Sequence, residues 1–208
     1  MNAFFFCDFN LVECASMNRQ DALNLVHEYT ASESLRRHML AVEAAMRAYA
    51  RKYGEDENRW GIVGLLHDFD YERWPDPPDH PLKGAEILEG LSYPKEVIYA
   101  IKSHADYLPD CPRVSKLDKT LYACDELAGF IMATAKVRPE GLTGMRAKSV
   151  KKKMKQKSFA AAVSREDIIH GAEDLGEPLD DHIQFVIDAM IEISAPLGFE
   201  NNASESSD

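Results

Sequence analysis

The sequence predicts an all-α protein folded as a compact helical bundle. Apolar residues recur every three or four positions along most of the 208 residues, and the alternation typical of a half-buried strand is almost absent. Residues that cap helices stand before several of these segments, and proline or glycine often follows them. With 45% hydrophobic and 28% charged residues, the composition is that of an ordinary globular domain.

Residues suited to helix starts give the order of the elements. Asn18, Ser32 and Asp56 can cap helices, as can Ser115 and Ser164 further along, and proline can open the remaining ones. Three prolines within residues 72–79 exclude a helix interior and predict a loop there. We therefore expect helices over residues 18–29, 32–53, 56–70, 81–90, 94–108, 116–137, 165–175 and 178–194.

The length of the chain fits a single domain with short appendages. We expect this domain to span residues 18–198, with the candidate site in its core at residues 36–135. Residues 1–17 are expected to be an N-terminal extension, either disordered or the product of a start misplaced upstream of Met17. The polar segment 199–208 is expected to be a disordered tail.

The net charge of the chain limits its expected binding partners, and the spacing of its cysteines indicates its expected cellular compartment. A net charge of −11 argues against nucleic acid and anionic membranes as partners, because an acidic surface repels phosphate polymers. The sequence has no run of about 18 apolar residues that would suit a transmembrane helix. The four cysteines form no Cys-x-x-Cys pair, which favours reduced thiols and a cytoplasmic protein.

Four histidines and two aspartates are the candidate site residues. His38, His104 and Asp125 each interrupt an apolar helix face, formed by residues such as Ile101 and Leu121. A lone histidine there is more often a satisfied core residue, but a buried carboxylate needs a compensating cation. Imidazole and carboxylate ligands together suit two divalent transition metal ions, from Fe, Mn, Co, Ni or Zn. The full set is His38, His67, Asp68, His80, His104 and Asp125.

The order His, His-Asp, His, His, Asp resembles the HD-domain superfamily of metal-dependent phosphohydrolases over residues 36–135. The segment HPLKGAEIL, which begins at His80, is similar to the matching part of HDIG and HD-GYP proteins. It also resembles small bacterial HD proteins that hydrolyse diadenosine tetraphosphate, and the run KLDKTLYACD, ending at Asp125, is similar to their last-ligand helix. The resemblance implies a helical bundle of the HD-domain type.

The resemblance also implies a role for each candidate residue. The first metal ion would be bound by His38, His67, Asp68 and Asp125, and the second by His80 and His104, with Asp68 bridging. The implied reaction is hydrolysis of a phosphate ester or anhydride by metal-bound hydroxide, in a nucleotide or another small phosphorylated molecule. Asp68 and Lys83 are the expected catalytic residues. Lys83 would contact a phosphate, although a solvated helix lysine is an equally good interpretation.

The sequence departs from the family pattern at several positions, and it leaves two rival functions open. The lysine that many relatives carry after the His-Asp pair is absent from Phe69-Asp70-Tyr71, and Asp70 is expected either to orient a ligand histidine or to end the helix. No Gly-Tyr-Pro follows His104, so hydrolysis of cyclic di-GMP is not expected. An HD-type di-iron oxygenase acting on a small molecule would use the same ligands, as would a non-catalytic regulatory module. The loop around Trp74 is the best candidate for covering a substrate.

Overall fold

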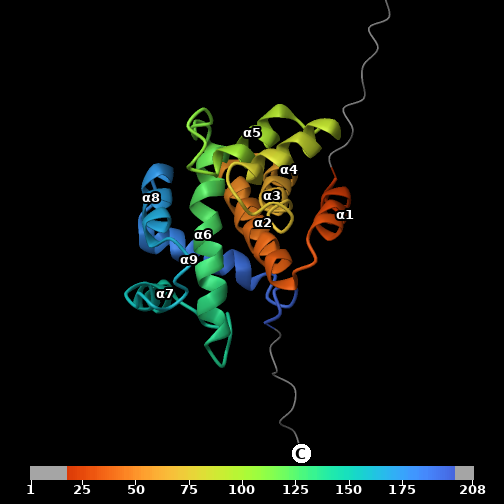
Figure 1. Cartoon of the computed structure of the whole chain (residues 1–208). Coiled ribbons are helices and arrows are strands. Elements are labelled where there is room, and N and C mark those ends of the chain that lie inside the picture. Colours follow the sequence, from red (N-terminus) through yellow and green to blue (C-terminus); the bar gives the residue numbers. More distant parts are fainter. Residues whose placement is uncertain (1–17, 200–208) are drawn as a thin grey trace, which may run out of the picture.

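The structure is a computed structural model that describes residues 18–199, and every regular element in that range is an α-helix (Figure 1). The all-α prediction is therefore confirmed. The predictions for residues 1–17 and 200–208 lie outside the described residues, and Phe199, assigned above to the tail, packs against the core. The helices are α1 (Arg19–Tyr29), α2 (Glu33–Tyr53), α3 (Glu57–Leu66), α4 (Asp79–Gly90), α5 (Lys95–Ser103), α6 (Lys116–Lys136), α7 (Ala147–Met154), α8 (Arg165–Leu175) and α9 (Leu179–Ile191).

Side-chain caps fix most of the helix starts where the sequence predicts them. Ser32 accepts a hydrogen bond from the backbone N–H of Leu35, and the side chains of Asn18, Asp56 and Ser164 cap their helices in the same way. Helix α6 begins with a capping box, in which Ser115 and Asp118 each accept from the other's backbone N–H. These caps satisfy backbone donors that the first helical turn leaves without partners.

Helices α3 and α5 end earlier than predicted, and both end at a candidate ligand. We expected them to reach residues 70 and 108, but His67 and His104 are their C-terminal caps. The Nδ1 atom of each imidazole donates to the carbonyl oxygen three residues back, at Gly64 and Ile101. Because the side chain occupies a carbonyl that the next helical turn would use, the chain leaves the helix there.

Helix α6 runs through the middle of the bundle, with α2 and α3 on one side and α8 on the other (Figure 1). Helix α2 lies close against α3 because two glycines face it. A Cβ atom at Gly64 would come within 3.0 Å of the Glu43 backbone, and one at Gly61 within 2.5 Å of the Arg47 side chain. This close approach sets the separation between His38 on α2 and the end of α3. Among residues 18–199, no helix is long and apolar enough to cross a membrane.

Candidate metal centre

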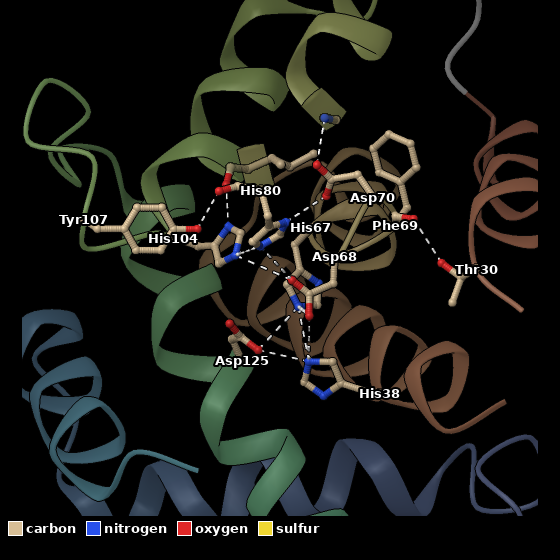
Figure 2. A network of polar contacts seen from close by, with 12 residues as sticks. Thr30, His38, His67, Asp68, Phe69, Asp70, His80, His104, Tyr107 and Asp125 are labelled. Atoms are coloured by element: carbon tan, nitrogen blue, oxygen red, sulfur yellow. Dashed lines mark hydrogen bonds and ion pairs between the residues drawn. The ribbon is translucent and has the colours of Figure 1, made fainter. Parts of the chain in front are cut away.

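Five helices bring the six candidate ligands together in one interior cluster (Figure 2). His38 and Asp125 lie within α2 and α6, so the helix faces that we predicted to point inward direct them to the cluster. The other four ligands lie at or just beyond helix ends. His67 and His104 cap α3 and α5, and His80 precedes the helical part of α4, with an extended backbone angle ψ of 133°.

His38, His67, Asp68 and Asp125 form the first donor group. The Nε2 atom of His38 lies 3.2 Å from Nε2 of His67 and 3.0 Å from Oδ1 of Asp125. The Nε2 atom of His67 lies 3.3 Å from the same aspartate oxygen and 3.5 Å from Oδ2 of Asp68. Nitrogen and oxygen donors of four side chains thus surround one point.

Asp68, His80 and His104 form the second donor group. The two imidazoles face each other with an Nε2–Nε2 distance of 3.2 Å. Oδ1 of Asp68 lies 3.3 Å from Nε2 of His80 and 3.6 Å from Nε2 of His104. Asp68 therefore turns one carboxylate oxygen to each group, Oδ2 to the first and Oδ1 to the second.

Hydrogen bonds on the far side of three imidazoles direct their Nε2 atoms into the cluster. The backbone carbonyls of Gly64 and Ile101 can only accept, so Nδ1 of His67 and of His104 must carry the hydrogen. Nδ1 of His80 donates to Asp70 over 2.8 Å. In each neutral ring the Nε2 lone pair is left to bind a cation, which is the arrangement found around metal-bound histidines.

Asp70 holds His80 in place, which was one of its two predicted roles. Its Oδ1 atom accepts from His80, and its Oδ2 atom accepts from the backbone N–H of Gly84 at 2.8 Å. A Cβ atom at position 84 would lie 2.8 Å from the Asp70 carboxyl carbon, so glycine is needed for this approach. The carboxylate is buried and connects the turn after α3 to the first turns of α4.

The buried carboxylates of the cluster favour positive charge beside them, either as protons on the imidazoles or as metal ions that replace those protons. Burial alone would lower the pKa of the His67 imidazole, but the carboxylates of Asp68 and Asp125 raise it well above its usual value. Burial also lowers the pKa of His80, while hydrogen bonds with Asp68 and Asp70 raise it to about 9. Burial would raise the pKa of Asp68 and Asp125, yet the histidines keep both well below the usual value. These carboxylates stay ionised and attract cations.

Sequence reasoning missed Tyr107, which connects the two histidines of the second group. It lies three residues after His104, and its hydroxyl donates to the backbone carbonyl of His80 (Figure 2). The irregular segment after α5 carries no periodic signal that would have indicated this contact. The bond ties the end of α5 to the start of α4, next to the second donor group.

Lys83 lies outside the cluster. Its Nζ atom forms an exposed ion pair with Glu86 at 3.0 Å, and among the described residues it makes no contact with the six candidate ligands. The loop after α3 lies beside the cluster instead: Tyr71, Glu72 and Pro75 line a cavity of about 570 Å³ that also borders His38. The loop predicted to cover a substrate therefore forms one wall of the cavity beside the first donor group.

The family comparison agrees with this geometry. The family model for the HD domain matches residues 35–129, a range that contains all six candidate ligands. No solved structure matches the chain. The match and the all-α fold confirm the resemblance drawn from the order of the histidines and aspartates. Residues 35–129 thus match the HD domain, and over that range the chain resembles the metal-dependent phosphohydrolases of the HD-domain superfamily.

Proposed function

We propose that this protein is a phosphohydrolase that works with two metal ions, one in each donor group. The substrate is a phosphate ester or anhydride of a nucleotide or another small phosphorylated molecule. The observation that carries the proposal is the orientation of Asp68, whose two carboxylate oxygens face different groups of imidazole nitrogens. A carboxylate in this position suits a bridge between two cations.

The donor distances support metal binding. A metal–ligand bond of about 2.0–2.1 Å places two ligands of one ion about 2.9–3.4 Å apart. The pairs His38–His67, His38–Asp125, His67–Asp125, His80–His104 and His80–Asp68 lie between 3.0 and 3.3 Å. Two Nε2 lone pairs at such distances would repel each other without a cation or proton between them. The nitrogen and oxygen donors suit Fe, Mn, Co, Ni or Zn.

Bound metal ions would polarise a phosphate oxygen and lower the pKa of the water molecule that attacks phosphorus. The residues of the chain hold this site in position before substrate arrives. Asp70 and Tyr107 fix the ring and the backbone of His80, and Gly64 fixes the ring of His67. The side chains of Asp68 and Asp125 are 15% and 20% exposed, so a phosphate can reach the cluster from solvent.

Phosphate release by metal-loaded protein tests the proposal. Protein stripped with a chelator and reloaded with Mn, Fe, Co, Ni or Zn is assayed against nucleotides, dinucleotides and simple phosphate monoesters. We expect metal-dependent turnover that falls at least about a thousandfold in Asp68→Ala, because this change removes a ligand from both groups. His170→Ala, which changes an exposed histidine on α8, is the matched control. Oxygen consumption without phosphate release would instead indicate the oxygenase.

A further inference from the structure

The cavity beside His38 follows one face of α6 away from the metal cluster. Gly129, Met132, Ala133 and Lys136 line it at steps of three and four residues. From Gly129 to Lys136 the helix rises by about 10 Å, at 1.5 Å per residue. The opposite wall comes from the start of α2 and from the loop after α3. We call this cavity the α6 groove; its two ends are His38, beside the cluster, and Lys136.

Most of the surface that the groove exposes is apolar. Leu35, Pro75 and Met132 line the groove, and Tyr71 lies where it borders the cluster. The exposed aromatic side chains among residues 18–199 are Tyr71 and Tyr107, at 43% and 44% exposure. Both contact His80, because the Tyr71 ring stands edge-on 5.1 Å from the imidazole and Tyr107 donates to its carbonyl. An aromatic ring that is exposed beside such a site offers a face on which a flat ligand can stack.

The wall formed by the loop after α3 is held in place from behind. The Glu72 carboxylate accepts from the backbone N–H of Ser32 at 2.8 Å. The Arg73 guanidinium lies 4.0 Å from the centre of the Tyr29 ring, and the Trp74 ring lies 6.2 Å from the same ring. These contacts attach the loop to the end of α1 and the start of α2. The groove is therefore formed before a ligand binds, which reduces the entropy that binding must overcome.

Lys136 provides a free positive charge at the far end of the groove. Within residues 18–199 its side chain forms no ion pair and no hydrogen bond with another side chain, and it is exposed. The one carboxylate that lines the groove belongs to Glu72, and it is engaged by the N-terminal end of α2. An anionic group at this end of the groove would meet Lys136 without displacing an existing partner.

We infer that the α6 groove binds the alcohol part of a phosphate monoester, and that this alcohol carries a flat apolar ring and a second anionic group. The phosphate lies at the metal cluster, the ring lies between Tyr71 and Met132, and the second anion pairs with Lys136. The inference rests on the proposed function, because it assigns the non-reacting part of the same substrate. Hydrolysis breaks the bond between phosphorus and the alcohol oxygen, water supplies the new oxygen, and the alcohol leaves with a proton.

Three phosphate monoesters of increasing size test the inference with metal-loaded protein. They are methyl phosphate, benzyl phosphate and 3-[4-(phosphonooxymethyl)phenyl]propanoate, which adds a carboxylate at the far side of the ring; their leaving alcohols are similarly acidic, so differences in rate report binding. We expect kcat/KM to rise about tenfold or more with the ring, because its burial removes apolar surface from water. The carboxylate should add about threefold to fivefold, which is the effect of an exposed ion pair.

Groove variants identify the residues responsible. In Lys136→Gln the ratio of kcat/KM between the last two esters should fall to about one, while Lys136→Arg and the exposed control Lys148→Gln should retain it. Ala133→Phe fills the groove and should remove the preference for benzyl over methyl phosphate; its melting temperature checks that it is folded. Equal kcat/KM for all three esters, or a carboxylate effect that survives in Lys136→Gln, would overturn the inference.

A binding measurement separates this inference from the proposed function. The product alcohol 3-[4-(hydroxymethyl)phenyl]propanoate is titrated into protein as purified and followed by ligand-observed NMR. We expect saturable binding that weakens in Lys136→Gln and in Ala133→Phe, whether or not any ester is hydrolysed. The groove assignment would be contradicted if the alcohol did not bind. It would also be contradicted if binding were unchanged in both variants, because the carboxylate would then lie on the metals. Absence of hydrolysis with groove binding intact would count against the proposed function alone.

Discussion

Two environments in this protein contain buried histidines, and they differ in what surrounds the ring nitrogens. In the metal cluster, Nε2 atoms face one another and the carboxylates of Asp68 and Asp125. In the core, His182 on α9 donates from Nε2 to the carbonyl of Ala123 and accepts at Nδ1 from the Tyr49 hydroxyl. His182 is thus satisfied by neutral partners on both sides, whereas the cluster histidines face carboxylates and one another's nitrogens, which favours a proton or a metal ion between them.

The pKa directions of the two environments follow from this difference. Burial lowers the pKa of His182, and the hydrogen bond to Ala123 and the nearby Glu177 carboxylate only partly oppose it. In the cluster the carboxylates outweigh burial and raise the pKa of His67 and His80. Burial alone therefore does not set the direction of a histidine's pKa shift; the charge of its partners does. Three substitutions sharpen this comparison, from the largest expected effect to the smallest.

Asp70→Asn tests whether a buried carboxylate that touches a single ligand controls metal binding. The amide keeps the shape but loses the charge that orients and polarises His80, so the affinity for the second metal ion should fall about 10- to 100-fold. Competition with a metal-binding dye measures it. Asp118→Asn is the matched control, because Asp118 is equally buried but accepts only from the backbone of Val114 and Ser115. An equal loss of affinity in both variants would show that Asp70 has no special role.

His182→Phe tests the core histidine. The Tyr49 hydroxyl and the Ala123 carbonyl lose their partner, so the free energy of unfolding should fall by about 1–3 kcal/mol at pH 7.5. Because the folded-state pKa of His182 is lowered, its contribution to stability is present above about pH 6.5 and declines as the pH falls below that value. The difference between wild type and variant should therefore shrink between pH 7 and pH 5, as measured by urea unfolding. A constant difference would contradict the lowered pKa.

Lys83→Gln tests the predicted phosphate contact and has the smallest expected effect. The ion pair with Glu86 is exposed and contributes little, so Lys83 can leave it for a phosphate. We expect KM to rise about twofold to threefold with the metal content unchanged. Glu86→Gln serves as the control, because it frees Lys83 without removing its charge. If KM is the same in all three proteins, Lys83 has no part in substrate binding.

The sequence predicted the helices other than α7, and which residues gather in the cluster, better than it predicted where α3 and α5 end. The inward stripes of α2 and α6 identify His38 and Asp125 because a helix holds its period through its interior. The same apolar pattern continues past His67 into the buried Phe69, so it could not signal that the imidazole would occupy a carbonyl and end α3. Contacts made in irregular segments, such as that of Tyr107 with the His80 carbonyl, depend on tertiary structure and left no periodic signal.

The central claim is that Asp68 joins two donor groups, each of which binds a metal ion. Elemental analysis of anaerobically purified protein tests it most directly, in wild type, His80→Ala and His182→Phe. We predict two metal equivalents in wild type and in His182→Phe, and about one in His80→Ala, which retains only the first group of ligands. Fewer than two equivalents in wild type, or a stoichiometry that is unchanged in His80→Ala, would contradict the two-metal centre.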